Sequence, residues 1–96
     1  MYLKIHKSER EFLVAVCDKE VIGKTFKESN LILEASEFFY KGELATSTQV
    51  IEALANATIA NLIGKKAVNC AIEGGYCSAE NVIKIQEVPH AQIVMM

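Results

Sequence analysis

The sequence predicts an α+β domain with a mostly antiparallel sheet of about five strands and two to three helices packed on one face. Three observations lead to this expectation. Short segments of alternating or continuous apolar residues lie near both ends of the chain. A long central segment has the apolar spacing of amphipathic helices. The 96 residues suit a single domain, 1–96, and no linker rich in Pro, Gly or Ser divides them.

The first two strands are expected at residues 2–6 and 11–17. Leu3 and Ile5 alternate with polar neighbours, as in a strand with one buried face. The second strand is continuously apolar after its first residue, which is typical of a strand covered on both faces. The short polar segment between them predicts an antiparallel hairpin.

Residues 18–30 carry no clear period. Asp18 is a candidate cap for a short helical turn that stops at Gly23. A third strand is expected at residues 31–36, and the aromatic run 38–40 either extends it or turns away. Because neighbouring side chains of a strand point to opposite faces, the aromatic residues cannot all face inward. We therefore expect one exposed ring beside buried ones.

The centre of the chain is expected to be helical. Thr46 and Gln49 have the spacing of a capping box, and an apolar helical stripe follows them. From Thr58 to Gly74 the spacing again predicts a helix, which ends at two consecutive glycines. The segment 50–74 is long enough to carry the chain back for a parallel pairing, so that alternative stays open.

Two further strands are expected at residues 82–86 and 90–95, with a break or turn at Pro89. His90 and Gln92 are two residues apart, so both project from one face of the last strand. They could hydrogen-bond a ligand or a base edge. The ordinary alternative is that both residues lie on the solvent-exposed face of an edge strand, a position that the neighbouring Pro89 favours.

Charge and cysteine content restrict the function classes. Ten basic and twelve acidic residues give a net charge of −2, which argues against a protein held on nucleic acid mainly by bulk charge. The three cysteines are scattered, so neither a zinc site nor a disulfide framework is expected, and no cofactor is implied. The chain shows no signal-peptide pattern and no apolar run of roughly 20 residues. We therefore expect a cytoplasmic protein that does not enter a membrane.

The expected helix over 58–74 carries a polar stripe formed by Thr58, Asn61, Lys65 and Asn69. Hydroxyl and amide groups with one lysine are suited to docking on a partner or on phosphates. The alternative is an ordinary solvent-facing side of the helix.

Two patterns could indicate catalysis, but each lacks a feature that its chemistry needs. Gly23-Lys24-Thr25 resembles the end of a phosphate-binding loop, but Asp18 stands where that motif needs glycine. Cys17 lies at the end of an apolar strand and would need His90 nearby to act as a nucleophile. A free cysteine in such a strand is ordinarily part of the core.

Several strings taken together resemble the archaeal family of uncharacterised proteins with domain of unknown function 424. They span nearly the whole chain and are Val16-Cys17-Asp18, Ile22-Gly23-Lys24-Thr25, Phe39-Tyr40-Lys41-Gly42, residues 57–64 and Val88-Pro89-His90-Ala91-Gln92. The resemblance implies an archaeal source, a stand-alone cytoplasmic domain, no established activity and a link to genes of translation and RNA processing. It transfers no catalytic residue.

Together these observations predict a non-enzymatic module that binds RNA or a ribonucleoprotein partner in translation or RNA metabolism. The candidate binding residues are Asp18, Lys24, Tyr40, Thr58, Asn61, Lys65, His90 and Gln92. The alternatives are a small enzyme that uses Cys17 and His90, and a structural subunit that docks through an exposed apolar patch.

Overall fold

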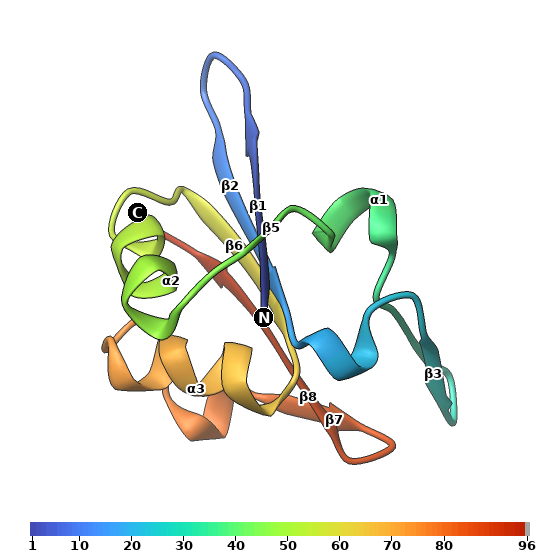
Figure 1. The fold of residues 1–96 in the computed structure, drawn as a ribbon. Coiled ribbons are helices and arrows are strands. Elements are labelled where there is room, and N and C mark those ends of the chain that lie inside the picture. Colours follow the sequence, from blue (N-terminus) through green and yellow to red (C-terminus); the bar gives the residue numbers. More distant parts are fainter. Residues whose placement is uncertain (96) are drawn as a thin grey trace.

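The computed structural model describes residues 1–95 and has the α+β class that the sequence predicts (Figure 1). Its main sheet has six strands in the order β5-β1-β2-β6-β8-β7. Their bounds are β1 Tyr2–Lys7, β2 Phe12–Cys17, β5 Glu43–Leu44, β6 Ile59–Ile63, β7 Ile83–Ile85 and β8 Val88–Val94. Neighbouring strands are antiparallel except for β2 and β6, which are parallel.

Different elements cover the two sides of this sheet. Helices α2 (Ser47–Leu54) and α3 (Lys65–Glu73) pack on one side, which we call the helix face. The other side, the hairpin face, carries α1 (Glu37–Tyr40) and a separate hairpin of β3 (Thr25–Glu28) and β4 (Leu31–Glu34) (Figure 1). Two short 3-10 turns, η1 (Lys19–Val21) and η2 (Ala79–Asn81), complete the structure. The third helix thus lies opposite the other two.

Strand β2 lies at the centre of both cores. Val14 and Val16 are fully buried against the helix layer, whereas Ala15 and Cys17 are fully buried on the hairpin face. This confirms that the continuous apolar run is a strand covered on both sides. Strand β1 pairs with it as the predicted antiparallel hairpin.

The predicted start of the first helix and the predicted end of the second are both confirmed. Thr46 accepts a hydrogen bond from the Gln49 amide, and the Gln49 side chain accepts one from the Thr46 amide, so the capping box is complete. Helix α3 ends at Glu73, directly before the two predicted stop glycines. The second of these, Gly75, has a φ of 80°, which side chains disfavour.

The prediction of one helix from Thr58 to Gly74 is wrong. Residues 59–63 form strand β6, and only the part after Gly64 is helical. The sequence of β6 fits a buried strand as well as a helix, and its place between β2 and β8 decides the outcome. Gly64 has a φ of 110°, so no helix can run through it.

The region between β2 and α2 also differs from the prediction. Strand β4 ends at Glu34 and pairs only with β3, outside the main sheet. The aromatic run forms α1, whose first turn is capped by the Ser36 hydroxyl accepting from the Phe39 amide. Tyr40 is 5% exposed and Phe38 is 82% exposed, which confirms one exposed ring beside a buried one.

At the C-terminal end, the turn between β7 and β8 lies at Gln86 and Glu87, both with positive φ. Pro89 lies inside β8 and does not break it. Strand β8 pairs with β6 on one side and β7 on the other. His90 therefore does not belong to an edge strand, and the sheet has one strand more than the expected five.

Candidate binding face on the sheet

Three of the predicted site residues meet on the hairpin face. Asn61 of β6 is the register partner of Gln92 of β8, and His90 is the partner of Ile63. Side chains of register partners leave the sheet on the same side, about 5 Å apart at Cβ. Ile63 contributes to the hairpin-face core, which fixes that side. The two amides and the imidazole therefore form one group, which we call the amide–imidazole face.

The alternation of both strands explains this arrangement. The neighbours of Asn61, Ala60 and Leu62, are fully buried in the helix-face core. The neighbours of Gln92, Ala91 and Ile93, are buried in the same core. Because successive strand residues point to opposite faces, the polar residues between them must project from the hairpin face.

The His90 ring is held in one orientation. Its Nδ1 atom lies 3.0 Å from the Leu62 carbonyl oxygen. A carbonyl can only accept, so Nδ1 carries the proton and the neutral ring presents Nε2 as an acceptor. Burial lowers the pKa of His90, while the bond to Leu62 opposes this shift. The neutral form is thus favoured near neutral pH.

The border of the amide–imidazole face is largely apolar. Val94 is 66% exposed and Ile83 is 48% exposed. Both are register partners of residues on the same face, Val94 of Ile59 and Ile83 of His90. The amides themselves reach the surface, with Gln92 exposed and Asn61 half-buried. Such a surface can hydrogen-bond a ligand at its centre and pack against it at the rim.

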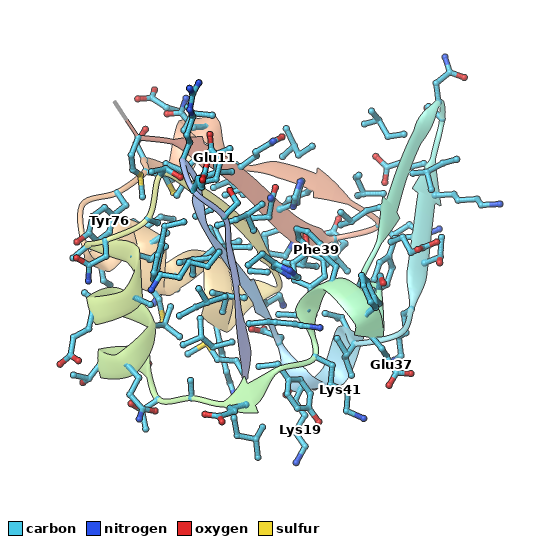
Figure 2. The ribbon with its side chains drawn as sticks, turned by 90° about the horizontal axis from the view of Figure 1, so that it is seen from above. Glu11, Lys19, Glu37, Phe39, Lys41 and Tyr76 are labelled. Carbon is cyan, nitrogen blue, oxygen red and sulfur yellow. The ribbon has the colours of Figure 1, made fainter. Side chains whose placement is uncertain are left out.

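An aromatic pair closes the β1 side of the hairpin face. The rings of His6 and Phe39 stack with centroids 4.7 Å apart, and His6 Nε2 lies 2.8 Å from the Phe39 carbonyl oxygen. Figure 2 shows α1 and Phe39 between the β3–β4 hairpin and the centre of the main sheet. The hairpin reaches the edge of that sheet at β7, where the Gln86 amide donates to Glu28 Oε1 and the Gln86 side chain donates to the Lys27 carbonyl. His6 is not among the predicted site residues, although its alternation with Leu3 and Ile5 predicts that it lies on the polar face of β1.

The polar stripe predicted along residues 58–69 does not exist as one surface. Thr58 precedes β6 and ties it to β2, since its hydroxyl donates to Glu11 Oε2 at 2.7 Å and accepts from the Phe12 amide at 2.9 Å. Lys65 is the first residue of α3, beyond the other end of β6. The strand–glycine–helix path separates both residues from Asn61.

Asp18 has a structural role that local sequence does not reveal. The residue is 4% exposed, and its carboxylate accepts hydrogen bonds from the Lys66 amide at 2.9 Å and the Ala67 amide at 2.8 Å. It therefore caps α3, and it makes no cap bond to the adjacent η1 turn. Gly64 allows this approach, because a Cβ atom there would lie 2.3 Å from Asp18 Cγ.

Tyr40 and Lys24 lie apart from the amide–imidazole face. Tyr40 belongs to the hairpin-face core, where burial raises the pKa of its phenol to about 12. Lys24 is exposed at the start of the β3–β4 hairpin, where its carbonyl accepts from the Ala35 amide.

The structure does not bring Cys17 and His90 together. Ile63 pairs with both of them, on β2 and on β8, so they are separated by two strand spacings of about 5 Å each. Cys17 is fully buried, and burial with the nearby Asp18 charge raises the pKa of its thiol to about 12. A thiol in this state is a poor nucleophile.

Residues 1–95 show neither a cluster suited to a metal ion nor a helix suited to a membrane. No group of three or more His, Cys, Asp or Glu side chains is arranged to hold a metal ion. No helix in this part of the chain has both the length and the apolar character needed to cross a membrane.

Comparisons with known proteins agree with the fold. A crystal structure of an uncharacterised conserved protein from Methanopyrus kandleri is similar, with a TM-score of 0.80 and 24% sequence identity. The match covers 99% of this chain and 92% of that one, and at this identity it shows a shared fold. No curated protein matches the chain at a significant level. The model of the family described as "Protein of unknown function (DUF424)" matches residues 6–96, so the chain belongs to the DUF424 family.

Proposed function

We propose that this protein is a non-enzymatic module of translation or RNA metabolism that holds a single-stranded RNA segment on its amide–imidazole face. One observation carries the proposal: Asn61, His90 and Gln92 project side by side from two paired strands onto the same face of the sheet, with Gln92 exposed and the other two half-buried. An archaeal source and a cytoplasmic location belong to the same proposal.

The chemistry of these side chains suits base recognition. Each amide offers a carbonyl acceptor and an NH₂ donor, and the His90 Nε2 atom offers a further acceptor. Sequence-specific RNA recognition uses unstacked bases, whose edges hydrogen-bond to such groups. The exposed aliphatic rim, including Val94 and Ile83, can pack against the base faces and the sugars.

The charge distribution favours contacts to bases over contacts to phosphates. The chain carries a net charge of −2, so general attraction to a polyanion is weak. We therefore expect binding with a shallow dependence on salt, with a slope that corresponds to only about one to three phosphate contacts. A steep slope would indicate a basic surface elsewhere on the molecule.

The direct test is fluorescence anisotropy with labelled single-stranded RNAs of about ten nucleotides, one for each base composition, and a duplex control. The variant Asn61→Ala/His90→Ala should bind at least about tenfold more weakly than wild type. Gln92→Ala changes an exposed residue and should weaken binding without changing the fold. Asn69→Ala removes an exposed amide from α3 and serves as the matched control.

Full binding by the double variant would show that the face is not the RNA site. A test in cells complements the measurement: affinity purification from the native host, with and without RNase. Ribosomal or RNA-processing proteins that are lost after RNase would support RNA contact. The same partners surviving RNase would favour the alternative of a protein-docking subunit, for which the exposed Ile32 of β4 is the natural anchor.

A further inference from the structure

The helix layer leaves one margin of the sheet uncovered. Helix α3 packs mainly on β8 and β6, and within residues 1–95 neither α2 nor α3 makes a major contact with β7 at the edge of the sheet. A groove of about 550 Å³ lies there on the helix face, between α3, η2 and the β7–β8 hairpin. Its volume falls within the range of small-molecule sites, about 300 to 1,000 Å³.

One wall of the groove is a regular stripe of α3. Lys65, Val68, Asn69 and Ile72 have the spacing of one helix face and all line the groove. The opposite wall is largely apolar and includes Val82 of the segment before β7. The groove is therefore apolar along most of its length.

The two lysines of the groove lie at the same end. The Gly64 amide donates to the Pro89 carbonyl at 2.9 Å, which places the start of α3 beside β8. Lys84 of β7 is the register partner of Pro89. Lys65 follows Gly64 directly, so both lysines flank the N-terminal end of the helix stripe.

Neither lysine is part of an ion pair in the described part of the chain, although Lys65 also borders a neighbouring hollow lined by Asp18, Glu20 and Glu87. The ion pair found within residues 1–95 joins Lys41 and Glu37, far from the groove in the fold. No carboxylate lines the groove itself. At the other end Asn69 donates to Glu73 Oε1 at 2.8 Å, which holds a negative charge near the apolar end of the stripe. The groove is thus electrostatically polarised along its length.

We propose that this groove binds a small amphipathic anion, with a carboxylate or phosphate head between Lys65 and Lys84 and an unbranched apolar tail along Val68 and Ile72. The distance along the helix from Lys65 to Ile72 is about 10 Å, which suits a tail of medium length. The groove lies on the opposite side of the sheet from the amide–imidazole face, so this proposal does not rest on the proposed RNA contact.

The test uses dodecanoate below its micelle-forming concentration, with isothermal titration calorimetry and amide chemical shifts of ¹⁵N-labelled protein. Saturable binding of one molecule per chain is expected, with shifts concentrated on α3, η2 and β7. Dodecyl phosphate should bind as well, and the ratio of the two affinities identifies the preferred head. Dodecyltrimethylammonium has the same tail with the opposite charge and should bind at least about tenfold more weakly.

The variant Lys65→Ala/Lys84→Ala should lose about tenfold or more in dodecanoate affinity. Lys66→Ala is the matched control, because this neighbouring lysine does not line the groove and should bind as wild type does. Ala79→Phe should block the tail without removing a charge. Unchanged affinity in the double lysine variant, shifts confined to the amide–imidazole face, or no saturable binding would each overturn the proposal.

Discussion

Replacing Asp18 by alanine tests how the end of β2 holds the start of α3. The carboxylate accepts from two backbone amides of α3 that lie 48 and 49 residues away in sequence, and the bond to the Ala67 amide is buried. Without the carboxylate, both N–H groups lose their partner. At an exposed helix cap, water would hydrogen-bond to the two freed N–H groups, but here the capping residue Asp18 is only 4% exposed.

The expected loss of stability follows from these two bonds. A hydrogen bond to a charged group contributes about 1.5 to 3 kcal/mol, and removing a helix N-cap costs about 1 kcal/mol. Because both bonds share one carboxylate, their contributions do not simply add. We expect the free energy of unfolding to fall by about 3 kcal/mol, which lowers the melting temperature by roughly 12 to 24 °C for a domain of this size.

Urea unfolding followed by circular dichroism measures the effect. Asp18→Asn should lose less, because one oxygen still accepts while the amide NH₂ opposes a backbone N–H. Glu20→Ala removes an exposed carboxylate two residues away and should change stability by less than about 0.5 kcal/mol. A loss below about 1 kcal/mol for Asp18→Ala would refute the idea that this carboxylate fixes α3.

Three further outcomes are expected. Gly64→Ala should lower the free energy of unfolding by at least about 3 kcal/mol, because the added Cβ would lie 2.3 Å from the carboxyl carbon of Asp18. Gly75→Ala meets no atom within 4 Å and should lose only about 1 to 2 kcal/mol, the strain that a side chain has at positive φ. Equal losses for the two variants in urea unfolding would contradict this reasoning. Cys17 should react with iodoacetamide far more slowly than the partly exposed Cys77 in native protein, as mass spectrometry of the alkylated peptides would show. Folding lowers the pKa of His90 below its unfolded value of about 6.5. The stability that the neutral ring contributes is therefore present above about pH 6.5 and is lost as the pH falls through the folded-state pKa. In His90→Gln the free energy of unfolding should depend less on pH below about 6.5.

The parts of the fold that were predicted correctly depend on neighbours in sequence. The β1–β2 hairpin, the Thr46 capping box and the stop at Gly75 each need only a few adjacent residues. The predictions that are wrong concern segments whose secondary structure depends on packing against residues far away in sequence. A five-residue apolar run such as β6 fits a helix or a strand, and its neighbours β2 and β8 lie far away in sequence. The cap of α3 by Asp18 is equally invisible locally.

The candidate site was predictable to the same limited extent. Alternation within one strand correctly placed His90 and Gln92 on one face. The sequence points to Asn61 only through a helical stripe that the structure does not contain, yet the pairing of β6 with β8 puts it opposite Gln92. Thr58 and Lys65 belonged to the same stripe and lie at the two ends of β6 instead. Residues share one face only if the assumed secondary structure is right, so the predicted helical stripe breaks up where the segment is a strand.

The topology explains why two open surfaces occur together. The parallel pair β2–β6 requires a connection that crosses the sheet, and here it spans residues 18–58 and carries the β3–β4 hairpin, α1, β5 and α2. Its first part covers one portion of the hairpin face, and its last part joins α3 in the helix layer. On the hairpin face the β3–β4 hairpin packs against β7 and hydrogen-bonds to the β7–β8 turn, so the part of β8 around Gln92 and Val94 stays exposed there. On the helix face α3 packs on β8 and β6, which leaves the groove beside β7.

Strand β8 links the two proposed sites physically. Pro89 lines the groove on the helix face, and the next residue, His90, projects from the hairpin face. A shift of the β8 backbone would therefore move both surfaces, whereas a change at one side chain would not. Lys84→Ala should affect only the anion and Gln92→Ala only the RNA, because neither alters the paired backbone of β8. If dodecanoate changed RNA affinity in wild-type protein, this shared strand would be the route of coupling.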